Sequence, residues 1–314
     1  MLSRVAERLY WMARYIERAE NTARMVMAFH TLALDMPRSA QLSWKGLVTV
    51  TGMDALFDER YQRDDDRNCV KFLVADTWNP GSVLSTLRSA RENVRTTRDL
   101  VPTEGWEIVN ELYLFARDNA EQGIGKRGRH DFLSEIVQRC QTLSGLLAGC
   151  MSHDAAYEFI RLGCNIERAD MSTRQVDAGA MRLLAQPDEH DPEDPYEGLL
   201  WTSILRSQSA FQMYRQHVKR RVNSIDVARF LLQDPDFPRS VAHTLTRSEY
   251  ALLKLPNNEL PLRFAVETRR HVLNADVGEL VAEDALHDFM DRLQLEIGEL
   301  HQAIANCWFP HSGH

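Results

Sequence analysis

Two stretches decide how this chain folds, and the first is Leu9-Tyr-Trp-Met-Ala-Arg-Tyr-Ile-Glu-Arg-Ala-Glu-Asn-Thr-Ala-Arg24. The second, at an offset of 150 residues, is Phe159-Ile-Arg-Leu-Gly-Cys-Asn-Ile-Glu-Arg-Ala-Asp-Met-Ser-Thr-Arg174. The Ile-Glu-Arg-Ala core and the final arginine coincide, and the acidic position after the core holds Glu20 in one stretch and Asp170 in the other. Similarity at so long a period predicts two copies of one structural unit.

The similarity continues downstream at offsets of 157 to 158 residues. The recurring pairs include Phe72-Leu73 with Phe230-Leu231, Ser82-Val83 with Ser240-Val241, Trp44 with Trp201, and Asp131-Phe132-Leu133 with Asp288-Phe289-Met290. We therefore expect a first helical repeat over residues 1–150 and a second over residues 151–314. Because tandem copies often share a core, the two repeats are expected to form one compact structural unit around a pseudo-twofold axis.

Apolar residues recur at spacings of three and four along residues 2–34, which predicts one face of a long amphipathic helix. Asn79 as N-cap and Pro80 as first helical residue predict a second helix to about Leu100. Other helices are expected from Pro102, around 132–147, and at 154–184, 196–220, 223–233, 239–254, 260–276 and 279–307. Turns are expected at 35–40, 58–67, 119–129 and 186–195, the last within an acidic, proline-rich loop. The predicted fold is an all-α bundle of about a dozen helices.

Composition narrows the class of protein. The 314 residues are 44% hydrophobic and 26% charged, with a net charge of −8, which is typical of a soluble globular protein. An acidic chain lacks the basic surface that broad attachment to nucleic acid requires. No apolar run is long enough to span a bilayer, and charged residues interrupt the N-terminus, so we expect no membrane span and a cytoplasmic location. The five scattered cysteines are expected to be reduced core residues.

The two Glu-Arg stretches hold the candidate site residues. On a helical wheel, most residues around Glu167 are apolar or small, which predicts a buried charged cluster. Glu20 with Arg24 and Asp170 with Arg174 are expected to form i,i+4 ion pairs. If the two helices cross near the pseudo-twofold axis, each remaining glutamate can meet an arginine of the other copy. The predicted cluster comprises Glu17, Arg18, Glu20, Arg24, Glu167, Arg168, Asp170 and Arg174.

Two interpretations of this cluster remain open from the residues alone. One is a buried salt-bridge network that fixes how the two copies dock. The other is a ligand site, in which the arginines bind a carboxylate or phosphate group. The carboxylate pairs one turn apart also have the form of a Mg²⁺ site, but the adjacent arginines oppose a cation and no histidine follows at i+3. The sequence therefore predicts neither a metal nor a cofactor.

Other chemical candidates have simpler interpretations. Asp64-Asp65-Asp66 lies in a charged turn and is expected to be a solvated loop. Ser82 and Ser240 are expected to act at helix N-termini rather than as nucleophiles. Asp154, beside His153, is expected to be a capping residue. No glycine-rich phosphate loop, nucleophile elbow or metalloprotease motif occurs.

The motifs resemble those of the bacterial alpha-E family, an all-helical domain with a Glu-Arg motif. The resemblance rests on residues 1–24, Asn79-Pro80-x-Ser82 with Ala90-Arg-Glu-Asn-Val-Arg95, Ile166-Glu-Arg-Ala-Asp170, and Pro238-Arg-Ser-Val241. It covers essentially the whole chain. One departure is Cys164-Asn165, where a Gly-Arg-Tyr-like run is expected. The arginine lost there weakens the idea that both copies bind the same ligand.

The resemblance implies a biological context. Such proteins are typically encoded beside, or fused to, circularly permuted ATP-grasp proteins that look like amide- or peptide-bond ligases, and transglutaminase-like cysteine peptidases are frequent neighbours. We therefore expect a helical accessory or binding subunit of a peptide-synthesising or peptide-modifying system. The alternative is an enzyme with an acid-base and anion-binding site between the Glu-Arg helices. A homo-oligomer that uses exposed helix faces is also possible.

Overall fold

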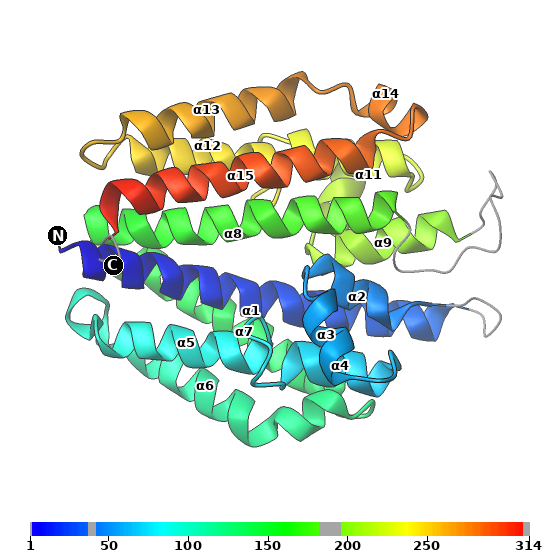
Figure 1. Ribbon diagram of the computed structural model, residues 1–314, viewed down its shortest axis with the longest axis horizontal. Helices are drawn as coiled ribbons and strands as arrows, with labels where there is room; N and C mark the ends of the chain where they lie inside the picture. The colour runs from blue at the N-terminus through cyan, green and yellow to red at the C-terminus, as the bar shows by residue number, and fades with distance from the viewer. Residues whose placement is uncertain (1, 37–41, 182–195, 310–314) are drawn as a thin grey trace.

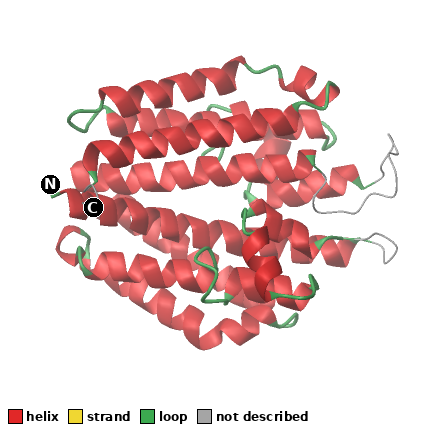
Figure 2. Ribbon diagram, viewed as in Figure 1, coloured by secondary structure: helices red, strands yellow, loops and turns green. Residues whose placement is uncertain are grey.

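The computed structural model describes residues 2–36, 42–181 and 196–309. Within these ranges the chain has fifteen α-helices and one short 3-10 helix at Arg98–Leu100. Figure 2 shows helices joined by loops and no β-strand in the described part of the chain. The helices up to the middle of the chain are α1 Ser3–Asp35, α2 Trp44–Val50, α3 Asp54–Arg60, α4 Asp66–Val74, α5 Val83–Arg95, α6 Thr103–Ile124 and α7 Arg129–Cys150. The later ones are α8 Ala155–Ala180, α9 Glu197–Ser207, α10 Phe211–His217, α11 Ser224–Gln233, α12 Val241–Leu252, α13 Glu259–Asn274, α14 Val277–Ala282 and α15 Leu286–Trp308. The all-α prediction is confirmed.

The two long helices α1 and α8 lie side by side at the centre of the molecule and run in the same direction (Figure 1). Helices α5 and α7 pack against α1 on one side, and α12 and α15 pack against α8 on the other. Helix α6 covers α5 and α7, as α13 covers α12 and α15. The two Glu-Arg stretches therefore lie on neighbouring helices at the centre of the bundle.

The order of helices in the second half follows that in the first. Helices α1, α2, α4, α5, α6 and α7 have counterparts in α8, α9, α11, α12, α13 and α15. Helix α9, however, packs along α1 of the other half, and α2 contacts α8. The order of elements agrees with the predicted duplication, which itself remains an interpretation of the sequence, as do the boundaries at 1–150 and 151–314.

Side-chain caps explain where several helices begin. Ser82 and Ser240 each accept a hydrogen bond from the backbone N–H three residues later, at 3.1 Å, and so cap α5 and α12. Asp154 caps α8 through the N–H groups of Ala156 and Tyr157. These three predicted roles are confirmed.

Some predicted boundaries were wrong. Asn79 does not cap α5: its side chain closes the preceding turn through Gly81 and the Phe72 carbonyl, and the helix ends at Arg95. The segments 196–220 and 279–307 are each broken in two, the first at Ser209, whose φ is +53°. The turns expected at 58–67 and 119–129 are shorter, because α3 and α6 extend into them. The turn expected at 186–195, which includes the acidic loop, and most of the turn expected at 35–40 lie outside the described residues.

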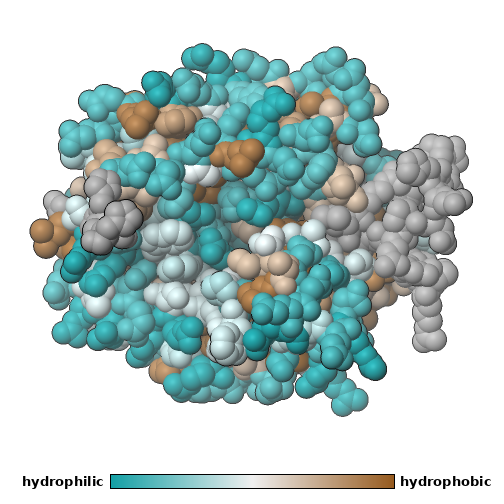
Figure 3. Space-filling model, in the orientation of Figure 1, coloured by the Kyte–Doolittle hydropathy of each residue, from teal (hydrophilic) through white to brown (hydrophobic). Residues whose placement is uncertain are grey.

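The core follows the predicted apolar stripes. On α1 the side chains of Leu9, Met12 and Val26 are at most 1% exposed. All five cysteines are free, but Cys150 is exposed, so the prediction of a core position was wrong for that residue. The visible face is mainly hydrophilic, with apolar residues scattered over it (Figure 3). No helix in the described ranges combines the length and the apolar character needed to cross a bilayer.

Candidate functional site

The candidate site lies beside a close contact between α1 and α8. Gly163 permits this approach, because a Cβ at that position would lie only 2.2 Å from the carbonyl oxygen of Tyr10 and 3.2 Å from the Cβ of Ala13. One turn further along each helix, Glu17 and Glu167 are buried, with 2% and 1% of their surface exposed. Both glutamates are therefore withdrawn from water and need partners inside the protein.

Each glutamate finds its first partner on the opposite helix. Arg18 binds Glu167 with two hydrogen bonds, Nε to Oε1 at 2.5 Å and Nη2 to Oε2 at 2.9 Å. Arg168 binds Glu17 in the same way, Nε to Oε1 at 3.0 Å and Nη2 to Oε2 at 2.7 Å. The two Glu-Arg sequences thus exchange partners across the helix pair in planar, two-point arrangements that suit guanidinium and carboxylate groups.

A second arginine completes each pairing, and here the two copies differ. On one side Arg14 Nε donates to Glu167 Oε2 at 2.7 Å, from one turn before Arg18 on α1. On the other side Arg239 Nη1 donates to Glu17 Oε1 at 2.8 Å, from the loop that precedes α12. Sequence reasoning did not assign either arginine to the cluster.

The second arginines occupy positions that are not arginine in the other copy. Arg14 aligns with Cys164 at the offset of 150, and Arg239 aligns with Gly81 at the offset of 158. Each copy therefore has an arginine at one of these two positions and a small residue at the other. The sequence held one weak signal for these two arginines: where one copy lacks an arginine, the other copy has it. As a result, each central carboxylate has two arginine partners.

The outer part of the cluster contains the two predicted i,i+4 pairs. Arg24 donates to Glu20 at 2.7 and 2.9 Å, and Arg174 donates to Asp170 at 3.1 Å. Arg239 links the outer and central parts on one side, because its Nη2 donates to Glu20 at 2.8 Å. All eight residues proposed from the sequence therefore lie in one continuous region along α1 and α8.

The charges of the arginines control the ionisation of both central glutamates. Burial alone raises the pKa of Glu167, but the charges of Arg18 and Arg14 outweigh burial and lower that pKa to about 2. The pKa of Glu17 is likewise lowered well below its usual range, because Arg168 and Arg239 outweigh the effect of burial. Both carboxylates are thus fully ionised at neutral pH.

Positive charge is in excess in this region. Four carboxylates face six guanidinium groups, those of Arg14, Arg18, Arg24, Arg168, Arg174 and Arg239. The cluster therefore carries two more positive than negative charges. Guanidinium groups already contact both oxygens of Glu17 and of Glu167, in the positions that a bound cation would take. An anion suits this environment better than a metal ion.

A cavity of about 70 Å³ reaches the cluster on the Glu17 side, between α1, α7 and α8. Its polar end is formed by Glu17, Arg168, Arg161 and Cys164, and its apolar wall by Met12, Ile16, Leu143, Leu147 and Ile160. Arg161 makes no ion pair or hydrogen bond with any residue in the described ranges. The cavity thus offers one uncommitted guanidinium beside an apolar wall.

Cys164 is not suited to act as a nucleophile in this cavity. Burial raises the pKa of its thiol to about 12, and the thiol donates to Glu17 Oε2 at 3.1 Å. The reactive form of cysteine is the thiolate, which is scarce at neutral pH when the pKa is so high. The residue serves as an additional hydrogen-bond donor to the glutamate.

The prediction that the aspartates at 64–66 form a solvated loop was only partly right, because two of them have structural roles. Asp65 caps α4 through the N–H of Asn68 at 2.9 Å. Asp66 is 14% exposed in its side chain and pairs at 2.7 Å with Arg129, which is fully buried. Nothing in the sequence pattern distinguished this arginine from the exposed ones, because its partner is 63 residues away.

Comparison with known protein families identifies the family of this chain. The profile of Alpha-E, described as a predicted alpha-helical domain with a conserved ER motif, matches residues 1–309. The chain belongs to the Alpha-E family. Within this Alpha-E chain, the Glu-Arg sequences at 17–18 and 167–168 are the ones that lie at the centre of the fold and exchange partners.

Curated relatives of this Alpha-E chain include uncharacterized proteins of Mycobacterium bovis and Mycobacterium tuberculosis. They are 23% identical over 318 aligned residues, and the match covers 95% of this chain. It covers only 34% of those proteins, so the chain spans about a third of the length of the curated relatives it matches. No solved structure matches the chain.

Proposed function

We propose that this Alpha-E protein is a helical binding subunit that works with an ATP-grasp-type amide or peptide ligase in peptide synthesis or modification. The resemblance of its motifs to proteins found with such ligases supports the choice of partner. A cytoplasmic location, and a transglutaminase-like peptidase as a further partner, belong to the same proposal.

The ionisation of the central glutamates supports binding rather than catalysis. General acid-base catalysis works best when the pKa of the catalytic group lies near the operating pH. Glu167, with a pKa of about 2, and Glu17, with a pKa below the usual range, are both far from that condition. Both also have their oxygens bound by arginine, so the acid-base alternative has no favourable observation behind it.

The cavity beside Glu17 is the observation that carries the binding role. An apolar cavity of about 150 Å³ can hold a molecule of benzene, so a cavity of about 70 Å³ has room for a smaller group of heavy atoms. A carboxylate with a short apolar neighbour fits this volume, the free guanidinium of Arg161 and the apolar wall. We infer that the cavity receives the carboxyl end of a peptide with a small side chain.

The carboxylate preference can be tested with a pair of compounds that differ in one charge. N-acetyl-alanine should raise the melting temperature of the full chain, whereas N-acetyl-alanine amide should not. Arg161→Ala should abolish the shift without changing the melting temperature of the unliganded protein. Arg63→Ala, in an exposed turn, is the matched control and should keep the shift. Equal effects of acid and amide, or an unchanged response of Arg161→Ala, would contradict the proposed ligand site.

The partner is tested separately, by co-expressing the chain with an ATP-grasp-type ligase of the same organism. A complex that survives size-exclusion chromatography supports the proposal. Two separate peaks at micromolar concentration would count against it. This outcome is independent of the peptide experiment, so failure of one does not obscure the other.

A further inference from the structure

A second group of potential metal-ligating side chains lies where the end of α8 meets the start of α15, and its first member, Asp177, follows Arg174 of the Glu-Arg cluster by one helical turn. Asp177 Oδ1 is 2.7 Å from His287 Nδ1, and His287 Nε2 is 3.8 Å from Asp291 Oδ2. One ligand atom from each of the three residues can be chosen so that all lie within 4.8 Å of one another. Three such atoms can surround a single metal ion.

The local fold explains why these groups converge. His287 and Asp291 are four residues apart on α15 and therefore share one face of that helix. That face packs on α8, which supplies Asp177 from its last turns. The side chains are 15%, 37% and 60% exposed for Asp177, His287 and Asp291, so an ion can reach them from solvent.

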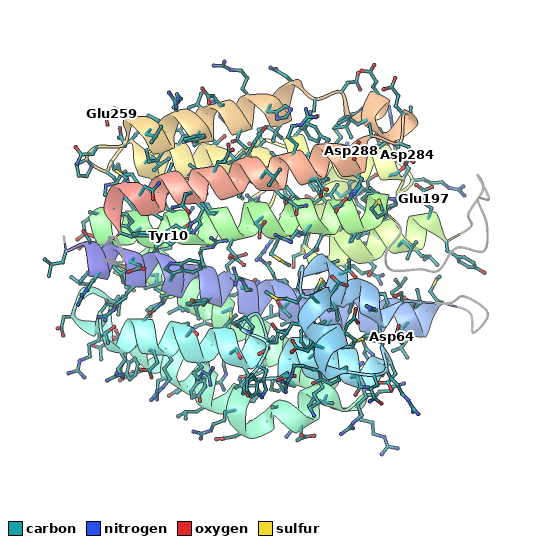
Figure 4. The ribbon with its side chains drawn as sticks, in the orientation of Figure 1. Tyr10, Asp64, Glu197, Glu259, Asp284 and Asp288 are labelled. Carbon is teal, nitrogen blue, oxygen red and sulfur yellow. The ribbon has the colours of Figure 1, made fainter. Side chains whose placement is uncertain are left out.

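A cavity of about 270 Å³ adjoins the group, and His287 lines it. Its other polar residues include Glu197, Asp284 and Asp288, which Figure 4 places together around the junction of α9, α14 and α15. None of these three carboxylates pairs with a cationic side chain in the part of the chain that the structure describes. The described lining of the cavity therefore carries an excess of negative charge, which attracts cations.

The corresponding place in the first half of the chain lacks this arrangement. At the offsets of 150 and 157 residues, the counterparts of Asp177, His287 and Asp291 are Met27, His130 and Ser134. Helix α7 still packs on α1 there, as α15 packs on α8. The junction of two such helices thus forms without the two acids, so packing alone does not account for their presence in the second half.

We propose that Asp177, His287 and Asp291 bind one divalent transition-metal ion. A set of one imidazole nitrogen and two carboxylate oxygens suits Zn²⁺ or Mn²⁺ better than Mg²⁺ or Ca²⁺, which prefer oxygen ligands alone. Three protein ligands leave coordination positions open, and the adjoining cavity gives them access to water or to an oxygen of a small ligand. This site does not depend on the function proposed for the Glu-Arg cluster.

The ion would replace the direct hydrogen bond between Asp177 and His287. Without a metal, the imidazole of His287 lies between two carboxylates, with Asp177 near Nδ1 and Asp291 near Nε2. Histidines between acidic side chains also occur on protein surfaces that bind no metal. The two possibilities differ in what they require of Asp291. A metal needs it as a ligand, whereas the Asp177–His287 hydrogen bond at 2.7 Å does not involve it.

The test uses the full chain, freed of metal by a chelator and titrated with Zn²⁺ and Mn²⁺ by calorimetry. One ion of each should bind per chain, and Co²⁺ in place of Zn²⁺ should give visible absorption bands typical of nitrogen and oxygen ligands. His287→Ala and Asp291→Asn should each weaken binding by on the order of 100-fold. His271→Ala is the matched control, because His271 pairs with Glu296 at 2.7 Å without a third acid, and it should bind like the parent chain.

Two results would overturn the proposal. One is binding of Zn²⁺ and Mn²⁺ no tighter than millimolar by the parent chain. The other is unchanged affinity and stoichiometry in both His287→Ala and Asp291→Asn, which would show an adventitious ion only. Circular dichroism of each variant confirms that the helical fold is retained, and the partial exposure of both side chains makes that the expected result.

Discussion

Glu17 and Glu167 show how the chemistry of a residue depends on its neighbours. A glutamate at 1% exposure would be expected to lose its proton reluctantly, yet the pKa of Glu167 is lowered to about 2. The reason is that two guanidinium groups stabilise the carboxylate more than burial destabilises it. Removing one member of this network would leave its partners buried without an opposite charge, which is energetically costly.

Glu167→Ala should therefore be strongly destabilising, because it leaves Arg14 and Arg18 without their carboxylate. Breaking a buried pair costs about 3–5 kcal/mol, which lowers the melting temperature by on the order of 10 °C. Differential scanning calorimetry measures the effect, and Arg63→Ala should be within about 1 °C of the parent chain. A melting temperature for Glu167→Ala equal to that of the control would show that the network is not structural.

The lowered pKa of His301 predicts how the free energy of unfolding changes in mild acid. Burial lowers the pKa of His301 to about 4, and its Nδ1 contacts the hydroxyl of Tyr10 at 2.9 Å. The folded state thus keeps the ring neutral while the unfolded chain protonates it near its ordinary pKa of about 6.5. The contribution of His301 to the free energy of unfolding is therefore fully present above about pH 6.5, and it should decline as the pH falls from about 6.5 to about 4.

The measurement is a series of urea melts at intervals between pH 7 and pH 4. His301→Gln should flatten the decline in this window, since glutamine does not titrate. The loss linked to Glu167 lies lower, between about pH 4.5 and pH 2, because the pKa of that group is depressed. An unchanged decline in His301→Gln would assign the effect to other groups.

At the scale of the element, the pairing of α1 with α8 depends on small residues at the point of contact. Gly163 brings the backbone of α8 against the carbonyl of Tyr10 on α1, one turn before the exchanged ion pairs. The arginines and glutamates reach each other because the two helix axes lie close together there. A sequence repeat alone places equivalent residues on equivalent helices but does not say how far apart the helices are.

Gly163→Ala should separate these helices, because its Cβ would lie 2.2 Å from a backbone oxygen that cannot move alone. Overpacking of this kind costs about 1–3 kcal/mol, and more if the ion pairs are lengthened. Thermal unfolding measures the loss. Gly145→Ala in α7 is the matched control, since a Cβ there meets nothing within 4 Å, and it should be neutral or stabilising by up to about 1 kcal/mol. Equal effects of the two substitutions would contradict the close approach.

At the scale of the whole molecule, the two halves are joined by more than the central helix pair. Arg239 of the second half contacts Glu17, Glu20 and Asn21 of the first. Arg24 of α1 donates to Ser209 beyond α9, and α9 itself packs along α1. Neither half supplies the arginines that pair with its own central glutamate, while the single shared structural unit remains a prediction. Oligomerisation remains a prediction.

We predict that residues 1–150 and residues 151–314, produced separately, do not fold independently. Each half would expose one side of the central helix pair, and its central glutamate would lose both of its arginine partners, because these come from the other half. Near-ultraviolet circular dichroism and cooperativity of urea melts should show little fixed tertiary structure in either half, and mixing them should restore it. A cooperative transition in one half alone would mean that the repeats are separate domains.

The sequence by itself determined the all-α class, the two central Glu-Arg helices, the caps at Ser82, Asp154 and Ser240, and the i,i+4 pairs. These features depend on local periodicity and on short-range hydrogen bonds, which one sequence displays directly. The duplication also pointed to the exchange of Arg18 and Arg168 between helices, because equivalent residues near a twofold axis meet one another.

Only the tertiary structure decided the remaining parts of the site. Arg239 lies 222 residues from Glu17, and Asp177 lies 110 residues from His287, so no periodicity relates them. The cavity beside Arg161 likewise depends on tertiary packing, because α1, α7 and α8 all contribute residues to its lining. Local pattern fixes which face of a helix is apolar, whereas long-range partners depend on how distant helices pack, and that packing is a property of the folded chain.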